Sequence, residues 1–297
     1  MKKAIKITNF GTKELEKKYS VVFIGTHSEI IHLSRISFET SQPENTLTYA
    51  VDQEALYSFK ESNIKSVILS ESLMENHEID SDKNYILTSD PEKLFTKISN
   101  DIFIEKKYEL VEHLIDDSFE LDKSSFISEN VSIGKNVRLG RNSYVYENTI
   151  IEDNVSIGDN CVIGSPGLNV FQNINKKNIF TQSIGGVKIS KNSLINNFVN
   201  IHKGTGGRFT NVNKNSIIGS FVNLGHDVVI GENSLVIDGC KLAGHVTLGI
   251  NVLLGLNTTV LQNINMADYS RSGIGTVVTR DVEKNSFVVG NPGRVIS

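Results

Sequence analysis

The sequence has no tryptophan, four prolines and two cysteines among its 297 residues, and its charge is nearly balanced. Cys161 and Cys240 show neither CxxC nor Cys/His ligand spacing, which argues against a disulfide framework or a zinc site. No run of 18 apolar residues is present, and no long apolar run follows the N-terminal lysines. We therefore expect no membrane span and no signal peptide, and predict a cytoplasmic protein. A net charge of −4 disfavours a nucleic-acid partner.

Glycine is also rare in the first part of the chain, since 21 of the 23 glycines follow residue 120. Residues 1–120 mix short β-like runs with helix-like segments, and Asp90-Pro91-Glu92 has the residue types of a helix start. We predict a small α+β domain over 1–120. No GxGxxG motif follows its first strand, which disfavours a dinucleotide site.

After residue 120, aliphatic residues recur at every sixth position. The register runs from Ile127 to Ile163, from Ile189 to Ile201 and from Ile218 to Met266. Five copies of [Ile/Leu]-Gly-x-Asn supply glycine and asparagine for sharp corners. Three short six-residue repeats per coil predict a parallel β-helix over 121–297, with about six stacked coils and both cysteines in its core. Insertions interrupt the register near 165–183 and 203–214, where repeat proteins often place binding residues.

These repeats resemble the hexapeptide-repeat acyltransferases, which implies a left-handed β-helix and a mainly β fold. The order of the two domains is similar to that in the N-acyltransferases of lipid A synthesis. The segments that carry this resemblance are LTYAVDQEALYSF at 47–59, VIGSPG at 162–167 and SIIGSFVNLGHDVVIGENSLVIDG at 216–239. From residue 252 to the end the chain is more similar to acetyltransferases that use acetyl-CoA and nucleotide sugars. The resemblance implies a homotrimer with active sites between neighbouring β-helices.

The resemblance also implies a catalytic base, His226, within the segment Leu-Gly-His-Asp-Val at 224–228. A histidine titrates near neutral pH and can take the proton that an attacking amine must lose. Asp227 is expected to increase the basicity of the imidazole. Gly244 occupies the position one full coil above His226, and its N–H is expected to stabilise the thioester oxygen as charge develops.

Further residues are candidates for binding the two substrates. Gly255 and Gly273 occupy the same position in successive coils and predict a bare backbone track for the pantetheine arm of coenzyme A. Candidate ligands for its phosphates are Arg280, Lys284 and Arg294. His202, beside the second interruption, and His245, one full coil above Asp227, are candidates for the sugar site. The resemblance also implies that the domain over 1–120 is nucleotide-binding-like, with nucleotide contacts at Tyr49 and Asp52.

Two departures from the lipid A enzymes bear on the substrate. Their aromatic, Asn and Tyr ligands of uracil correspond here to Tyr49, Asp52 and Ala55, and no C-terminal helical extension follows the last coil. We therefore predict transfer of an acyl group from acyl-CoA to the amine of a nucleotide-linked amino sugar, favouring a dTDP-amino-dideoxysugar, without a metal. One alternative is the lipid A N-acyltransferase with an acyl carrier protein as donor. Another is a non-catalytic nucleotide-sugar-binding β-helix.

A γ-type carbonic anhydrase shares the expected fold and binds zinc through histidines. The three histidines of this β-helix, His202, His226 and His245, are widely separated in the sequence. This spacing does not match the closely spaced pair of that family, so the sequence disfavours a zinc enzyme.

Overall fold

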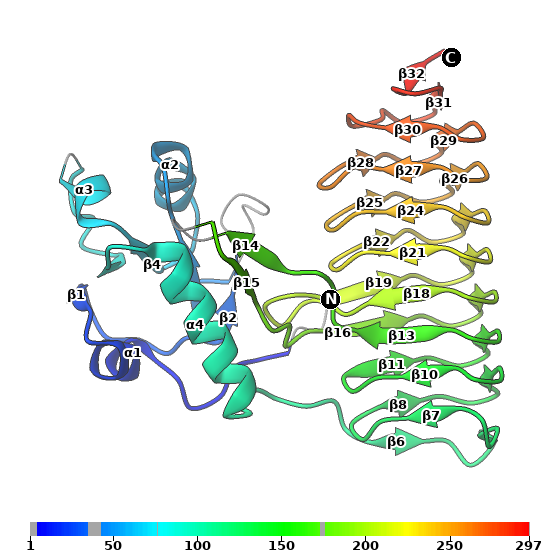
Figure 1. Cartoon of the computed structure of the whole chain (residues 1–297), viewed down its shortest axis with the longest axis horizontal. Coiled ribbons are helices and arrows are strands. Elements are labelled where there is room, and N and C mark those ends of the chain that lie inside the picture. The colour runs from blue at the N-terminus through cyan, green and yellow to red at the C-terminus, as the bar shows by residue number, and fades with distance from the viewer. Residues whose placement is uncertain (1–4, 35–42, 76, 173–175, 297) are drawn as a thin grey trace. The chain divides into compact units, whose positions relative to one another are not determined.

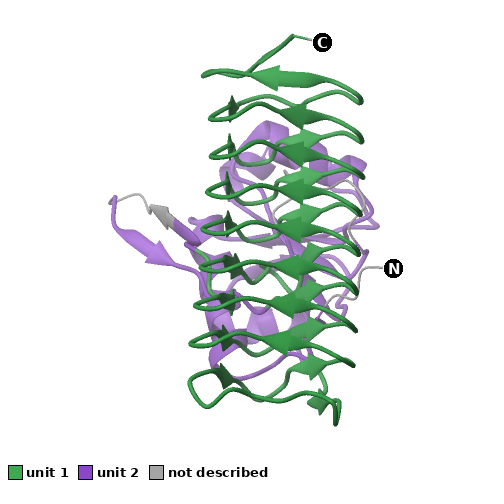
Figure 2. Ribbon diagram, turned by 90° about the vertical axis from the view of Figure 1, so that its right-hand side faces the viewer, with its two compact units in different colours: residues 1–3, 110–167, 185–297 green, residues 4–109, 168–184 purple. Residues whose placement is uncertain are grey.

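The computed structural model describes residues 5–34, 43–75, 77–172 and 176–296, which form two compact units. One unit comprises the residues up to 109 together with 168–184, and the other comprises 110–167 and the residues from 185 onward (Figure 2). The boundary falls earlier than the residue 120 expected from the sequence. The first interruption belongs mostly to the N-terminal unit, although its residues 173–175 lie outside the described part of the chain.

The N-terminal unit contains a five-stranded mixed sheet in the order β1-β5-β4-β3-β2. Strands β2 to β5 are parallel and β1 pairs antiparallel with β5, which confirms the small α+β fold. The strands are β1 (Val22–Ile24), β2 (His32–Leu33), β3 (Thr46–Tyr49), β4 (Ser66–Leu69) and β5 (Asn84–Leu87). The helices are α1 (Thr12–Tyr19), α2 (Gln53–Glu61), α3 (Glu71–Met74) and α4 (Pro91–Ile104), and a hairpin consists of β14 (Val170–Gln172) and β15 (Asn178–Phe180).

Helix α4 begins where the sequence predicts, because Asp90 caps it by accepting a hydrogen bond from the N–H of Lys93 and Pro91 occupies its first turn. None of the helices in the described residues is long and apolar enough to cross a membrane.

The second unit is a parallel β-helix whose short strands form three sheets (Figure 1). Sheet I contains β7 (Phe126–Ile127), β10 (Tyr144–Val145), β13 (Val162–Ser165), β18 (Asn200–His202), β21 (Asn223–Leu224), β24 (Lys241–Leu242), β27 (Thr259–Val260) and β30 (Val277–Val278). Sheet II contains β6 (Leu114–Ile115), β8 (Ser132–Ile133), β11 (Thr149–Ile151), β16 (Gly186–Ile189), β19 (Phe209–Val212), β22 (Val229–Ile230), β25 (Thr247–Leu248) and β28 (Asn265–Met266). Sheet III contains β9 (Arg138–Leu139), β12 (Ser156–Ile157), β17 (Leu194–Ile195), β20 (Ile217–Ile218), β23 (Leu235–Val236), β26 (Leu253–Leu254), β29 (Arg271–Ser272), β31 (Phe287–Val289) and β32 (Arg294–Val295).

The chain winds from sheet I to sheet II to sheet III and back, and Figure 1 shows that this coil is left-handed. The predicted architecture is therefore confirmed. In the residues that the structure describes, the three sheets hold eight, eight and nine strands, so the β-helix is longer than the six coils counted from the sequence. The count fell short because the six-residue register breaks at the two interruptions and is weak at both ends.

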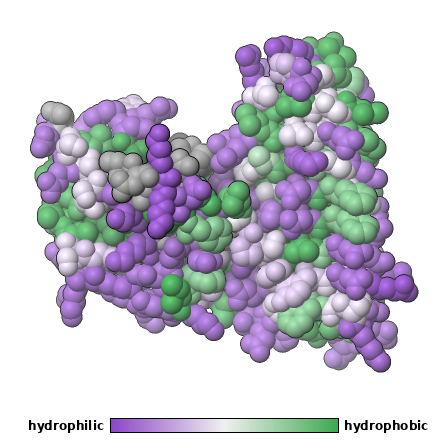
Figure 3. All heavy atoms as spheres, viewed as in Figure 1, coloured by the Kyte–Doolittle hydropathy of each residue, from purple (hydrophilic) through white to green (hydrophobic). Residues whose placement is uncertain are grey.

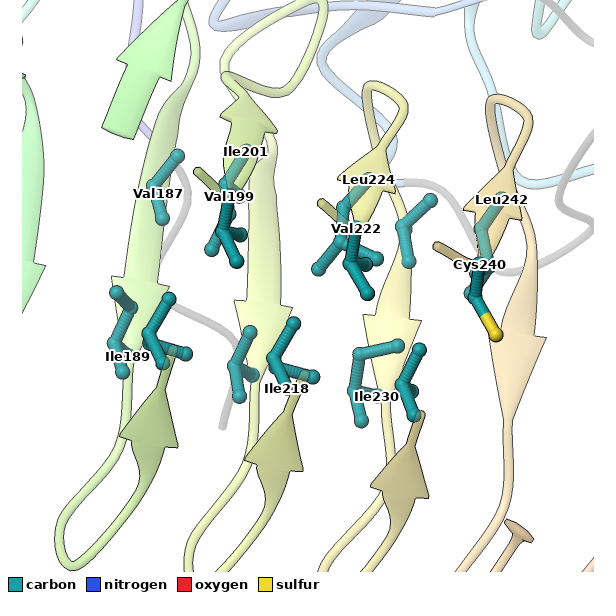
Figure 4. Packing of buried hydrophobic residues seen from close by; sticks show 14 of the residues in the cluster. Val187, Ile189, Val199, Ile201, Ile218, Val222, Leu224, Ile230, Cys240 and Leu242 are labelled. Atoms are coloured by element: carbon teal, nitrogen blue, oxygen red, sulfur yellow. The ribbon is translucent and has the colours of Figure 1, made fainter. Parts of the chain in front are cut away.

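The aliphatic anchors of the repeat point into the β-helix and stack in columns (Figure 4). Ile201, Leu224 and Leu242, for example, are consecutive members of one column and are at most 1% exposed. Burying an aliphatic side chain of this size contributes about 1.5–3 kcal/mol. Cys161 and Cys240 lie in the same core as free thiols, as predicted, and burial raises the pKa of Cys240 to about 11.

Each coil turns three corners, which we call I–II, II–III and III–I after the sheets that they join. Asparagine occupies most of the left-handed corner positions, with φ between 53° and 64°. At corner II–III the amides of Asn154, Asn192, Asn215 and Asn233 form a continuous ladder of hydrogen bonds of 3.1–3.2 Å. Other residue types at such corner positions of the β-helix are Phe198, Phe221, Asp227, His245 and Tyr269, together with glycines.

Candidate active site

His226 lies at corner I–II, directly after β21. Its side chain is 16% exposed, and its Nδ1 lies 2.9 Å from Oδ2 of Asp227. Because an ionised carboxylate only accepts hydrogen bonds, Nδ1 carries the hydrogen in this pair. The lone pair of Nε2 is therefore left to accept a proton.

Asp227 has a left-handed backbone with φ of 61°, and its side chain is only 4% exposed. Burial raises the pKa of this carboxyl group, but the positive charge of Arg208 and the hydrogen bond from His226 outweigh burial. The pKa of Asp227 therefore lies well below its usual range, and the carboxylate is charged at neutral pH.

Gly244 lies one coil above His226, at the same corner. A Cβ at Gly244 would lie 2.6 Å from both Nε2 and Cε1 of His226, so a larger residue would displace this ring. At equivalent positions of other corners, a side chain one coil further accepts the hydrogen bond of the backbone N–H, as Asp268 does for Ile250 and Asp238 does for Ser220. Within the described part of the chain, the Gly244 N–H has no such acceptor.

Two more histidines flank this arrangement. His245 packs edge to face on His226, with ring centroids 4.9 Å apart, and its Nε2 lies 3.6 Å from Oδ2 of Asp227. His245 thus lies beside Asp227, in agreement with its place one full coil above that residue. His202 lies one coil below, within hydrogen-bonding distance of Ser165 Oγ and the Asn200 amide at 3.2 and 3.1 Å. Burial lowers the pKa of His202, which keeps this ring neutral at pH 7.

The second interruption contributes residues that the sequence did not single out. Arg208 places its Nε 2.9 Å from Oδ1 of Asp227, and Thr205 donates its hydroxyl to Oδ2 at 2.7 Å and its backbone N–H to Oδ1 at 3.0 Å. The irregular, glycine-rich loop indicated a binding segment. Its contacts with Asp227, which follows in the next coil, depend on the path of the loop and not on the repeat.

The repeats themselves identify the type of β-helix. Residues 130–165 match the family model of the bacterial transferase hexapeptide, which is described as six repeats. Residues 130–165 therefore consist of repeats of the hexapeptide type. No curated protein sequence matches the chain.

The chain is similar to several solved structures. The UDP-N-acetylglucosamine acyltransferase from Francisella novicida has 26% identity over 59% of this chain and 64% of its own, with a TM-score of 0.51. The UDP-N-acetylglucosamine acyltransferase from Campylobacter jejuni has 25% identity over 60% of this chain and 74% of its own, with a TM-score of 0.49. LpxA from Acinetobacter baumannii has 23% identity over 62% of this chain and 73% of its own, with a TM-score of 0.46.

Within this hexapeptide β-helix, the predicted glycine track is present but lies at another corner. Gly255 and Gly273 stack at corner III–I, where a Cβ on Gly255 would lie 2.7 Å from the carbonyl carbon of Gly273. His226 and Gly244 lie at corner I–II. One chain therefore does not bring the track and the histidine together.

The predicted phosphate ligands also separate into two groups. Arg280 and Arg294 line a small cavity of about 170 Å³ near the C-terminal end of the β-helix, together with Asp281. Lys284 lies instead over the ring of Tyr269, with Nζ 5.6 Å from the ring centroid.

Tyr49 and Asp52, the predicted nucleotide contacts, both have structural partners within the N-terminal unit. The Tyr49 ring is buried against Phe95, and its hydroxyl donates to Glu92 at 3.2 Å. Asp52 caps α2 by accepting a hydrogen bond from the N–H of Ala55.

The side chains of His226, Asp227 and His245 are close enough together to be considered as metal ligands. Their donor atoms all lie within 4.8 Å of one another. The donor set does not fit a cation well. Both Asp227 oxygens already accept hydrogen bonds, and the guanidinium of Arg208 places a positive charge 2.9 Å from Oδ1.

Proposed function

We propose that this protein transfers an acyl group from a thioester to the amine of a nucleotide-linked amino sugar. The observation that carries the proposal is the juxtaposition of His226 Nε2, a proton acceptor, with Gly244, whose N–H lacks an acceptor within the described chain. These are the two groups that acyl transfer requires, a base for the nucleophile and a donor for the oxyanion.

The proposed reaction proceeds by direct attack. The amine nitrogen bonds to the thioester carbon while Nε2 of His226 takes its proton, and the Gly244 N–H stabilises the oxyanion of the tetrahedral intermediate. The carbon–sulfur bond then breaks, and the imidazolium returns the proton to the leaving thiolate. The products are an amide and a free thiol, with coenzyme A as the proposed thiol. His202 and His245 are proposed to contact the sugar.

The proposed assembly is a homotrimer, which is supported by an apolar surface on sheet III and corner III–I. Its exposed members are Leu194, Ile217, Leu253, Phe198 and Phe221, each between 37% and 63% exposed. The two phenylalanine rings stack nearly parallel, with centroids 4.8 Å apart. Figure 3 shows apolar side chains along the right edge of the β-helix, where corner III–I lies in Figure 1. Exposed apolar surface of this kind is typical of an interface between protein chains.

A second copy would also resolve the separation of the glycine track from His226. Gly255 and Gly273 lie at corner III–I. We therefore propose that they contact the acyl-CoA donor that is bound at the His226 site of another copy. Arg280 and Arg294 are the proposed contacts for the donor phosphates, and Lys284 is a more distant candidate.

A second candidate function differs only in the acceptor. The likeness to the Francisella novicida UDP-N-acetylglucosamine acyltransferase favours a sugar hydroxyl as nucleophile. The same base and oxyanion donor would serve that reaction, because a hydroxyl must also lose its proton on attack.

Thiol release with acyl-CoA and acyl-carrier-protein donors tests the proposal. The acceptors are dTDP-amino sugars, UDP-N-acetylglucosamine and UDP-3-O-acylglucosamine, with products identified by mass spectrometry. An amide product with a nucleotide amino sugar supports the proposal, and an ester with UDP-N-acetylglucosamine supports the second candidate. Replacing His226 by Ala is expected to lower kcat about 10²- to 10⁴-fold, while His77→Gln in the N-terminal unit serves as the control. Tight sugar binding without thiol release from any pair would favour a non-catalytic binding protein.

A further inference from the structure

The loop over 203–208 departs from the hexapeptide period and is packed tightly onto the preceding coil. Gly186 accepts a hydrogen bond from the N–H of Gly204 and donates one to the carbonyl of Arg208, both 3.0 Å long. A Cβ at Gly185 would lie 2.2 Å from two carbonyl oxygens of the loop, so the backbones are in close contact. Arg208 and Thr205 are therefore presented from a fixed backbone.

The loop supplies hydrogen bonds to both oxygens of one carboxylate. Oδ1 of Asp227 accepts from Arg208 Nε and from the Thr205 N–H, at 2.9 and 3.0 Å. Oδ2 accepts from the Thr205 hydroxyl at 2.7 Å and faces Nδ1 of His226 at 2.9 Å. Arg208 also donates from Nη2 to the Thr205 hydroxyl oxygen at 2.7 Å, which ties the two side chains together.

This arrangement meets two requirements of a buried carboxylate. A charge taken out of water needs a counter-charge, or the group protonates instead. A protonated Asp227 would no longer require Nδ1 of His226 to be the donor. The carboxylate also needs a fixed rotation, because Nε2 of His245 lies only 3.6 Å from the same oxygen and would compete for it.

We propose that Arg208 and Thr205 are positioning residues that keep Asp227 ionised and turned toward His226. They thereby fix the Nδ1–H tautomer of His226 and direct its Nε2 toward Gly244. The geometric part of this inference stands on the contacts alone, and its consequence for rate rests on the proposed acyl transfer. The charged or titratable groups that face the carboxylate are Arg208, His226 and His245.

Nitrogen-15 NMR of histidine-labelled protein tests the inference without an activity assay. The His226 signals are identified by their loss in His226→Gln. The wild type is expected to show the Nδ1–H tautomer, and Arg208→Gln and Thr205→Val are each expected to convert part of the population to Nε2–H. Arg208→Lys keeps the positive charge but not the planar guanidinium group. It is expected to shift the tautomer equilibrium of His226 less than Arg208→Gln does. Lys214→Gln is the matched control, since Lys214 forms an exposed ion pair with Glu232 at 3.1 Å at another corner.

Steady-state kinetics then connects the tautomer to the rate. Arg208→Gln is expected to lower kcat by about 10- to 100-fold, as for outer partners of functional histidines, with little change in KM. If Arg208→Gln does not fold, the single substitution Thr205→Val gives the same readout, because the Thr205 hydroxyl and N–H donate to the two oxygens of the same carboxylate. An unchanged His226 tautomer in the folded variants overturns the inference, whether or not the protein transfers acyl groups. A changed tautomer in a protein without acyl transfer supports the positioning and contradicts the proposed function.

Discussion

Gly244 lies directly over the imidazole of His226, so close that a Cβ would come within 2.6 Å of Nε2. The glycine is not required by its backbone angles, because Gly244 is not among the left-handed residues of the chain. A side chain at this position would instead displace the ring below it. The contact places the backbone of one coil against the candidate base of the preceding coil.

Gly244→Ala is expected to displace the His226 ring and lower kcat about 100-fold, because displacing a reacting group by about 1 Å can cost that much. Gly167→Ala is the matched control. Its Cβ would lie 3.4 Å from Cβ of His226, an ordinary van der Waals contact, so near wild-type activity is expected. Steady-state kinetics on both variants, with thermal melting to confirm folding, makes the comparison. Equal activities in the two variants would contradict the role of this contact.

Asp227→Asn is expected to lose stability in a pH-dependent way. The folded-state pKa of Asp227 is lower than its unfolded value of about 3.9, so the ionised group stabilises the fold above that pH. This stabilisation, about 1.5–3 kcal/mol for hydrogen bonds to a charged group, is lost as the pH falls toward the folded-state pKa. The difference in Tm between wild type and variant should persist down to about pH 5 and shrink below about pH 4. A difference that does not change with pH would show that the charge of Asp227 is unimportant.

Phe221→Asn is expected to weaken the proposed assembly without harming the monomer fold. A left-handed backbone costs a non-glycine residue about 1–2 kcal/mol, and asparagine tolerates it better than phenylalanine. The substitution therefore relieves backbone strain while it removes an exposed apolar ring. Light scattering during size-exclusion chromatography should show smaller assemblies. Tyr269→Asn, at a left-handed position of corner II–III, is the matched control, and an equal effect of both variants would argue against corner III–I as the interface.

Ile230→Ala is expected to lower the free energy of unfolding by about 2–5 kcal/mol, because it leaves a cavity in the core column between Val212 and Leu248. The neighbouring Val229 points outward, so Val229→Ala should cost much less. Denaturant unfolding measures both. Similar losses would mean that the inward register of β22 is wrong.

The hexapeptide register was sufficient to predict the β-helix, because a period of six places every anchor at the same point of a three-sided coil. The stacking of Gly244 on His226 and of His245 on Asp227 follows from the same rule, since residues three repeats apart lie on neighbouring coils. The buried cysteines could be read from their place relative to the anchors. All of these relationships depend only on the six-residue period, which places equivalent residues at the same point of every coil.

The tertiary structure decided what the repeat does not encode. The loop at 203–208 leaves the six-residue period, so its sequence could not show that Arg208 and Thr205 fold back on Asp227. The roles of Tyr49 and Asp52 depend on α2 and Phe95, which only the packed N-terminal unit brings beside them. The sequence by itself therefore determined the coil and its inward and stacked residues, and the path of the irregular loops determined how the candidate base is held.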